Sequence, residues 1–305
     1  TAASNETTFA SLPRDATVVF VMNHRSNMDY MLVTYLAARS SALSYAVGEW
    51  ARVWPLSTLI RSMGAYFIRR RSRGALYRKV LARYVQMATT GGVTQAFYPE
   101  GGLSLTGALQ PPKVGLLSYV VEGFDPEGER DIIFVPVAIN YDRILEDRVL
   151  IAAGERGDRR FGARITVVVG FVLRKIWRRM RGRDTRFGTA AVTFGDPLSL
   201  RRTGGDVPDP DLSEMLMDRI AQAMPVLTVP LIARVMLQAK GPLSEAELLA
   251  KVAATLEQMP LRNRVPKPDV LPDRVARATA RLKKRGVISE DAKGLQIAAG
   301  QEPVL

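Results

Sequence analysis

The stretch "ATVVFVMNHRSNMDY", residues 16–30, decides how the rest of the chain is interpreted. Its first seven residues, 16–22, form a short apolar run rich in β-branched side chains, which is typical of a buried β-strand. The run ends in Asn23 and His24, the single histidine of the chain, and a helix is predicted to begin near Met28. A strand that passes into a helix places His24 at the mouth of a sheet, where open α/β sheets bind ligands.

Asp29 follows His24 by five residues, and the pair has the makeup of a general-base site. Five residues correspond to about 140° on an ideal helix, so the two side chains cannot share one continuous helical face. A turn between them would bring the carboxylate to Nδ1, stabilise the imidazolium and leave Nε2 to take a proton from a substrate hydroxyl. The alternative, which is commoner for an isolated pair of this spacing, is a histidine that caps a helix or bonds to the backbone.

The composition of the 305 residues excludes several kinds of site. The absence of cysteine excludes disulfides, thiol catalysis and cysteine-ligated metal, and a single histidine excludes a histidine-rich metal site. With no G-x-S-x-G elbow either, the base would act directly on the substrate, without a covalent enzyme intermediate. The formal net charge of +13 suits an anionic partner such as nucleic acid, anionic lipid or a phosphorylated substrate.

The order of the predicted elements indicates two domains. Strands alternate with helices up to about residue 200, which predicts an α/β fold. Residues 202–214 are rich in turn formers and are interpreted as a linker, beyond which strands nearly vanish. We therefore expect an α/β domain over residues 1–204 and a smaller, mainly helical C-terminal domain over residues 205–305. Because Thr1 is not a natural start, we also expect a preceding piece to be missing or cleaved.

Polar residues also follow other predicted strands. The strand in residues 64–72 ends in Arg69 and Arg70, and arginines at a strand end can clamp a phosphate. "FYPEGGLSLTG", residues 97–107, joins a strand to a proline, an acid and paired glycines, whose backbone N–H groups can hold an anion. Lys113 follows shortly after this loop. Taken alone, the arginines could be a solvated charge run and the glycines an ordinary tight loop.

Together these segments resemble, in order, the sequence boxes of the glycerolipid acyltransferase superfamily, and in particular the bacterial membrane-bound glycerol-3-phosphate acyltransferases. The family box HRSxMDY is similar to residues 24–30, and GAFFIRR is similar to "GAYFIRR" at residues 64–70. EGGRSRTG is similar to "EGGLSLTG" at residues 100–107, PKxGxLS to residues 112–118, and PxxxxYdxvxE to residues 136–146. The resemblance covers roughly residues 16–200.

The resemblance implies a mixed sheet flanked by helices and the first step of phospholipid synthesis. In that step, a fatty acyl group passes from acyl-CoA or acyl-carrier protein to the 1-hydroxyl of glycerol 3-phosphate. By the same resemblance His24 is the general base and Asp29 its orienting partner, and no metal or other cofactor is expected. The residues expected to bind substrate are Arg25, Ser26, Arg69, Arg70, Glu100, Gly101, Gly102, Ser104 and Lys113.

The third box departs from the family at Leu103 and Leu105, where the family usually has arginines that are assigned to the acceptor phosphate. Two leucines cannot hold a dianion. We therefore expect other residues to bind the phosphate, with Arg69 as the leading candidate and Arg25, Arg70 and Lys113 behind it. The alternative is a different acceptor, such as lysophosphatidic acid or another phospho-acceptor.

Two segments predict peripheral or monotopic binding to an anionic membrane surface, on the cytoplasmic face of the cell membrane. Residues 28–63 are rich in apolar and aromatic residues, and residues 165–186 join an apolar run to basic residues around Trp177. A span of the bilayer is not expected, because no run of about 18 uninterrupted apolar residues occurs. The alternative for residues 165–186 is an amphipathic helix packed on its own domain.

A rival interpretation from another class is a basic protein without turnover. In one form of it, the C-terminal hundred residues are a winged-helix-like DNA-binding module, with "ARATARLKKRGVI" as the recognition helix and the following hairpin as the wing. The same layout serves equally as a helical scaffold, and similar tails occur in the acyltransferase family. We therefore expect no nucleic-acid partner.

Overall fold

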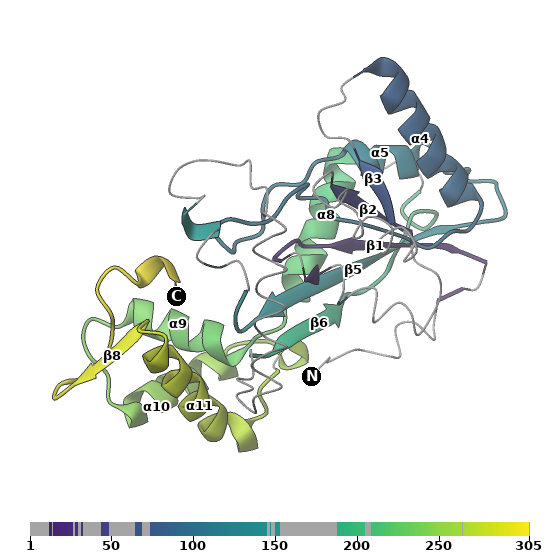
Figure 1. The fold of residues 1–305 in the computed structure, drawn as a ribbon. Helices are drawn as coiled ribbons and strands as arrows, with labels where there is room; N and C mark the ends of the chain where they lie inside the picture. The colour runs from purple at the N-terminus through teal and green to yellow at the C-terminus, as the bar shows by residue number, and fades with distance from the viewer. Residues whose placement is uncertain are drawn as a thin grey trace, which may run out of the picture.

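The computed structural model of the chain is drawn in Figure 1. It describes residues 12–13, 15–26, 28–29, 32, 44–48, 65–68, 74–144, 147, 150–152, 188–204, 209–263 and 265–304. The sequence predictions for Arg69, Arg70, most of residues 28–63 and the segment 165–186 lie outside the described residues.

The described residues form a seven-stranded mixed sheet. Its spatial order is β3 (Ala65–Ile68), β2 (Ser44–Gly48), β4 (Gln95–Phe97), β1 (Thr17–Met22), β5 (Ile132–Tyr141) and β6 (Ala190–Phe194), and β7 (Leu198–Ser199) also pairs with β5. The first five are parallel to one another, whereas β6 and β7 run antiparallel to β5. The predicted mixed sheet flanked by helices is confirmed.

β1 and β5 lie next to each other in the sheet, and both are nearly continuous apolar runs, as expected for parallel strands covered on both faces. In β5 every residue except Tyr141 is buried. Val21 of β1 pairs with Phe97 of β4 on one side and with Pro136 of β5 on the other. This register brings the carboxyl ends of β1 and β4 to one edge, beside the last residues of β5.

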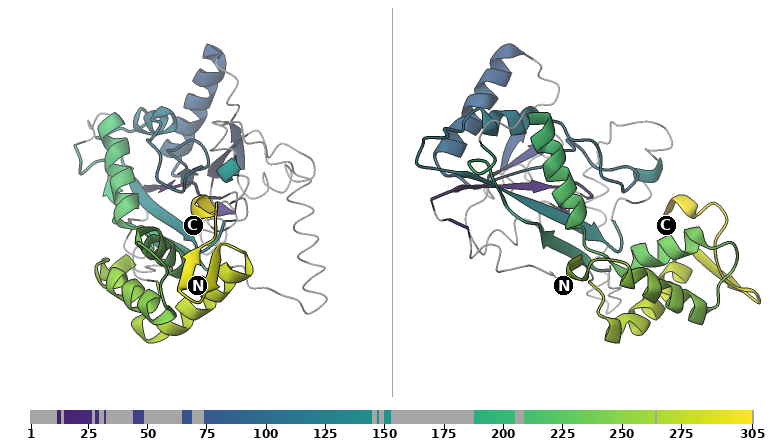
Figure 2. Two further views of the ribbon diagram at one scale, coloured as in Figure 1. Left: turned by 90° about the vertical axis from the view of Figure 1, so that its left-hand side faces the viewer. Right: turned by 180° about the vertical axis from the view of Figure 1, so that it is seen from behind.

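One face of the sheet is covered by α4 (Ala75–Thr90), α5 (Gly115–Val121) and α8 (Asp209–Gln222), as Figures 1 and 2 show. Because side chains alternate along a strand, Val19 and Val21 of β1 join the core under these helices, and Phe20 and Met22 join the core of the other face. Each of the three helices also contributes apolar residues to the core between the helices and the sheet. These residues are Val85, Leu117, Val120, Leu212, Leu216 and Ile220.

The packing of α8 bears on the predicted domain boundary. The sequence interpretation assigns α8 to the C-terminal domain, whereas its apolar side packs in the same core as β1 and β5. The boundary between residues 204 and 205 stays a prediction. The described residues that follow α8 form a third core of their own, which begins near Val226.

This third core lies among α9 (Thr228–Gln238), α10 (Glu245–Glu257), α11 (Leu271–Lys284) and a hairpin of β8 (Ile288–Asp291) and β9 (Gly294–Ile297). Short 3-10 helices cover Leu261–Asn263, Pro268–Val270 and Glu302–Val304. Ser244 is the N-cap of α10 and forms a capping box with Glu247. The Ser244 hydroxyl accepts from the Glu247 N–H at 3.2 Å, and the Glu247 carboxylate accepts from the Ser244 N–H at 2.8 Å.

The C-terminal helices lie near the carboxyl end of β5 (Figure 1). Two polar side chains at the end of that strand, Asn140 within it and Asp142 just after it, hold them there. The Asn140 amide donates to the carbonyl of Pro225 at 2.9 Å, and the Asp142 carboxylate accepts from the N–H of Val229 at 3.2 Å. The end of β5 therefore connects the sheet with the C-terminal helices.

Candidate active site

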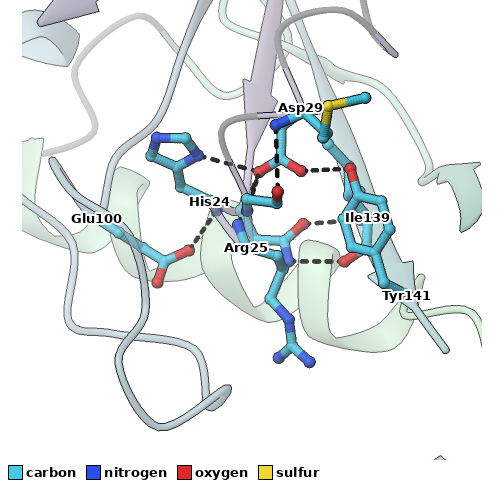
Figure 3. Close-up of polar contacts among 9 residues, drawn as sticks. His24, Arg25, Asp29, Glu100, Ile139 and Tyr141 are labelled. Atoms are coloured by element: carbon cyan, nitrogen blue, oxygen red, sulfur yellow. Dashed lines mark hydrogen bonds and ion pairs between the residues drawn. The ribbon is translucent and has the colours of Figure 1, made fainter. Parts of the chain in front are cut away.

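The loop after β1 folds so that the His24 and Asp29 side chains meet (Figure 3). Nδ1 of His24 lies 3.0 Å from Oδ2 of Asp29. The same oxygen accepts from the backbone N–H of Arg25 at 2.7 Å and of Ser26 at 3.0 Å, while the Asp29 N–H donates to the Ser26 carbonyl at 3.0 Å. A tight turn over these residues thus brings the carboxylate to the imidazole, which a continuous helix would not do.

Both partners are almost completely buried, with 3% of His24 and none of Asp29 exposed. A buried carboxylate needs compensating donors. Besides the three groups at Oδ2, the Tyr141 hydroxyl donates to Oδ1 at 2.6 Å (Figure 3). Because Nδ1 contacts the carboxylate, any proton transfer with a substrate would fall to Nε2.

Neighbouring strand ends fix the backbone of His24. The side chain of Asn23 accepts from the Ile139 N–H at 2.7 Å and donates to the Ile139 carbonyl at 3.0 Å, so the end of β1 is tied to β5. The His24 N–H donates to Glu100 at 2.9 Å, and its carbonyl accepts from the Ser104 N–H at 3.0 Å. These contacts hold His24 from both adjacent strands.

The His24 ring also stacks on a neighbouring ring. Its centroid lies 4.1 Å from that of Tyr98, and the ring planes are inclined by 25°. Tyr98 follows β4 directly, so this second neighbour of the imidazole comes from the same strand end as Glu100. The ring of His24 is therefore held on one side by a carboxylate and on one face by an aromatic side chain.

Glu100 is a buried acid whose carboxylate accepts hydrogen bonds from two loops. One carboxylate oxygen accepts from the His24 N–H and the other from the Gln110 N–H at 3.0 Å. Burial raises the pKa of Glu100 above its ordinary value, because it disfavours the charged form; the two N–H donors and the charges of His24 and Arg25 act in the opposite direction. Its described contacts join the loop after β1 to the loop after β4.

Arg25 brings a cation to the same edge. Its Nη2 donates to Asn140 at 3.3 Å, and its Nε is buried without a hydrogen-bond partner among the described residues. Burial lowers the pKa of its guanidinium, and the charges of Asp29, Glu100 and Tyr141 oppose that effect. A Cβ at Gly107 would lie 3.5 Å from Nη1, so the guanidinium lies alongside the third box.

Lys113 brings a second cation to this loop. Its N–H donates to the Pro99 carbonyl at 2.8 Å, and its side chain crosses Gly101. A Cβ at Gly101 would lie 2.9 Å from the Lys113 Cδ and 3.1 Å from its Nζ, and Gly101 has φ +67°. Glycine suits this position because the backbone has a left-handed conformation there, and an added Cβ would also require the Lys113 side chain to shift.

The remaining predicted residues have structural contacts in the described part of the chain. The Ser26 hydroxyl accepts from the Met28 N–H at 3.2 Å, and the Ser104 hydroxyl donates to the Ala108 carbonyl at 2.6 Å. Gly102 lies in the same loop as Gly101 and is half-buried, as are Leu103 and Leu105. The predicted substrate and catalytic roles stay predictions, although the structure brings all these residues to one edge of the sheet.

Sequence reasoning missed the roles of Asn23, Tyr98, Asn140 and Tyr141 as neighbours of the two site residues. Each stands within one or two residues of the end of β1, β4 or β5, and this position at a strand end is the signal that could have drawn attention to them. Among the described residues, no cluster of His, Cys, Asp or Glu has the makeup of a metal site. No helix in the same part of the chain is both long and apolar enough to cross a bilayer.

Comparison with known families gives two matches. The model described as "Acyltransferase" matches residues 5–140, and that described as "Glycerol-3-phosphate acyltransferase C-terminal region" matches residues 173–304. The first covers the strand ends that carry His24, Asp29 and Glu100, and the second covers α8 and the C-terminal helices.

Curated relatives of similar sequence are named glycerol-3-phosphate acyltransferase. One from Pseudoalteromonas atlantica is 30% identical over 247 residues, which are 73% of this chain and 29% of the relative. One from Xylella fastidiosa strain M23 is 28% identical over 287 residues, which are 85% of this chain and 32% of the relative. The chain thus spans about a third of the length of these relatives. The two models together match most of the chain, and the relatives named glycerol-3-phosphate acyltransferase align over 73–85% of it, so the chain belongs to the glycerolipid acyltransferase superfamily.

Proposed function

We propose that this chain is an acyl-thioester-dependent glycerol-3-phosphate O-acyltransferase with His24 as its general base. The observation that carries the proposal is the buried contact between His24 and Asp29 at the carboxyl edge of β1. The names of the relatives supply the acceptor, glycerol 3-phosphate. The donor is acyl-CoA or acyl-carrier protein, both of which present the acyl group as a thioester.

In the proposed reaction, Nε2 of His24 takes the proton of the acceptor 1-hydroxyl as its oxygen attacks the thioester carbonyl. The C–O bond forms and a tetrahedral intermediate results. When this collapses, the C–S bond breaks, and the imidazolium returns the proton to the departing sulfur. Asp29 holds the ring through Nδ1 and stabilises the imidazolium between the two transfers. No atom of the enzyme becomes acylated.

Two cationic side chains beside the candidate site, those of Arg25 and Lys113, support the proposal of an acceptor that carries a phosphate. Arg25 and Lys113 both border the loop after β4, and the carboxylates that act on the charge of Arg25 are those of Asp29 and Glu100. A guanidinium can hold two phosphate oxygens at once, which an ammonium cannot. Arg25 is therefore the leading phosphate ligand among the described residues, and Arg69 and Arg70 remain candidates from the sequence.

Leu103 and Leu105 favour one alternative acceptor. Half-buried leucines in the loop beside Arg25 would suit a phosphorylated molecule that also carries an apolar chain, such as lysophosphatidic acid. Acceptor choice is therefore the first property to measure.

The test supplies the purified chain with each acceptor, glycerol 3-phosphate or lysophosphatidic acid, and with each donor, acyl-CoA or acyl-carrier protein. Because the chain has no cysteine, a thiol reagent detects the released thiol without a protein background. We expect turnover with glycerol 3-phosphate, and a fall of about 10²–10⁴-fold in His24→Ala. A folded His24→Ala protein that keeps half the wild-type rate would rule out the mechanism.

We also propose that the chain binds the cytoplasmic face of the cell membrane as a peripheral protein. An acyl chain is insoluble in water, and the product of the proposed reaction belongs in a bilayer. One surface of described residues supports this. On α4, Leu76, Val80, Tyr84 and Met87 recur at helical spacing and are between 47% and 76% exposed. Lys79 and Arg83 flank this apolar stripe, and α4 contains no acidic residue, which suits anionic lipid.

Co-sedimentation with vesicles tests the membrane proposal. We expect the chain to pellet with anionic vesicles at low salt, and Leu76→Gln combined with Val80→Gln to weaken that binding. Leu261→Gln is the matched control, because Leu261 is 79% exposed but lies among the C-terminal helices. A wild-type chain that stays in the supernatant with anionic vesicles at low salt would contradict the proposal.

A further inference from the structure

The two oxygens of the Asp29 carboxylate differ in the number and the origin of their hydrogen-bond donors. Oδ2 accepts three hydrogen bonds, from the ring of His24 and from the backbone N–H groups of Arg25 and Ser26. Oδ1 accepts from the hydroxyl of Tyr141 at 2.6 Å. The three donors at Oδ2 belong to the same short turn as Asp29 itself, whereas Tyr141 lies 112 residues further along the chain (Figure 3).

We infer that Tyr141 is a positioning residue that fixes the plane of the Asp29 carboxylate and, through it, the orientation of His24. The inference rests on the proposed function of His24 as a general base. It assigns Tyr141 no contact with substrate. The hydroxyl acts only on Asp29, so its effect on turnover passes through the contact between Asp29 and His24.

Geometry gives the second anchor a task. The terminal torsion of an aspartate side chain has a broad energy minimum, so donors gathered at one oxygen leave the carboxylate free to pivot about that oxygen. The hydroxyl of Tyr141 restrains this pivot, because it approaches the other oxygen from the sheet rather than from the turn. Tyr141 is the last residue of β5 and pairs with Ala190 of β6, so its backbone is part of the ladder. A site residue supported from a regular element is held more accurately than one supported by its own loop.

The burial of Asp29 is a second reason for the positioning role of Tyr141. Asp29 has no exposed surface, so an oxygen that loses its donor inside the protein keeps the full cost of desolvation. Without the phenol, the carboxylate would rotate toward another donor or admit a water molecule. Rotation moves Oδ2 away from Nδ1, and a water molecule, which is not anchored in the sheet, restrains the carboxylate less than the phenol does.

The surroundings of Tyr141 are themselves anchored. Its N–H donates to the side-chain oxygen of Asn140 at 2.9 Å, and the same oxygen accepts from Arg25. The Asn140 amide donates to the Pro225 carbonyl. The charged and titratable groups described near the contact are Asp29, Arg25, Glu100 and the stacked Tyr98. Tyr141 thus stands at a junction between the turn, the sheet and the C-terminal helices.

The experiment compares Tyr141→Phe with the wild type and with Tyr119→Phe. Tyr119 is the matched control because it lies in α5, on the opposite face of the sheet. Loss of one hydrogen bond to a charged group should lower kcat by about 10-fold, with KM changed by less than about twofold. Tyr119→Phe should match the wild type in both constants.

A spectroscopic measurement separates positioning from general structural damage. The chain has one histidine, so its imidazole NMR signals need no assignment. In Tyr141→Phe, the Nδ1–H proton should resonate further upfield than in the wild type and exchange faster with water. In an Asp29→Asn background, adding Tyr141→Phe should lower kcat by less than about twofold, because the route through the carboxylate is already lost.

Failure of the inference and failure of the proposed function give different results. Tyr141→Phe with wild-type kcat and a wild-type imidazole spectrum would overturn the inference while acyl transfer stands. A shifted imidazole signal in a chain that acylates no acceptor would support the positioning role and reject the proposed reaction. If Tyr141→Phe does not fold, a fluorinated tyrosine at position 141 keeps the shape and changes the acidity of the phenol. An unmoved Nδ1–H signal in that protein would also overturn the inference.

Discussion

Asp29→Asn tests how much of the proposed rate depends on a negative charge beside the imidazole. Asparagine has one carbonyl oxygen, which must occupy the position of Oδ2 because three donors converge there. Its amide group then faces the Tyr141 hydroxyl, which can turn and accept. All four contacts therefore survive with neutral partners, and the variant should fold.

The size of the kinetic effect follows from the distance between the two side chains. With Nδ1 and Oδ2 3.0 Å apart, the centres of charge of an imidazolium and a carboxylate lie about 4 Å apart. At an effective dielectric constant of about 20, the interaction is ~4 kcal/mol. The carboxylate exerts it only when the ring is charged, so its loss should lower kcat by roughly 10³-fold. KM should change little, because Asp29 is not expected to touch substrate.

The assay follows the release of thiol from acyl-CoA, with denaturant unfolding as the check on stability. Asp142→Asn is the matched control. Asp142 also accepts from backbone N–H groups, those of Thr189 and Val229, but it has no described contact with His24. A folded Asp29→Asn protein with a kcat within about fivefold of the wild type would refute the reasoning, because the charge would then contribute about 1 kcal/mol or less.

Three further predictions follow from the same edge of the sheet. Because burial raises the pKa of Glu100, the folded chain binds its proton more tightly than the unfolded chain does, and this contribution to stability is lost as pH rises through the raised pKa. The difference in unfolding free energy between Glu100→Gln and the wild type should therefore shift in favour of the variant as pH rises from about 4 through the raised pKa, and a difference that stays constant would contradict the assignment. Asn23→Ala leaves the N–H and carbonyl of Ile139 without their side-chain partners, so the free energy of unfolding measured in urea should fall by ~2–6 kcal/mol. A fall of less than ~1 kcal/mol would show that water replaces the amide. Leu103→Arg combined with Leu105→Arg should raise the acceptor KM, because Arg25 and Lys113 already border that loop, whereas a lower KM would indicate a phosphate site that is merely weakened.

The strands and the main turn could be predicted because their signals are local. β1 and β5 are apolar runs whose length and flanking polar residues define them in the sequence. The cap of α10 is a four-residue pattern. The approach of Asp29 to His24 also depends on only a few residues, so the sequence could suggest the turn that the structure contains.

The long-range partners could not be predicted in the same way. Glu100 meets His24 across 76 residues and Tyr141 meets Asp29 across 112, and both contacts depend on the register among β1, β4 and β5. A one-residue change in register would turn each strand-end side chain to the other face of the sheet. The amphipathic pattern of α8 likewise indicates an apolar side but not which core that side will join.

The distribution of buried polar groups is itself an argument about function. Asn23, His24, Ser26, Asp29, Glu100 and Ser104 are each at most 4% exposed, although a packed apolar edge would be the more stable choice. Their donors and acceptors are mainly backbone groups of adjoining strand ends and loops, which cannot move without displacing the sheet. A protein keeps such an arrangement where orientation matters more than stability, and deviation from the most stable local choice is expected at functional sites. In this chain the buried polar groups surround the single imidazole, and this arrangement favours the proposed role of His24 as a general base.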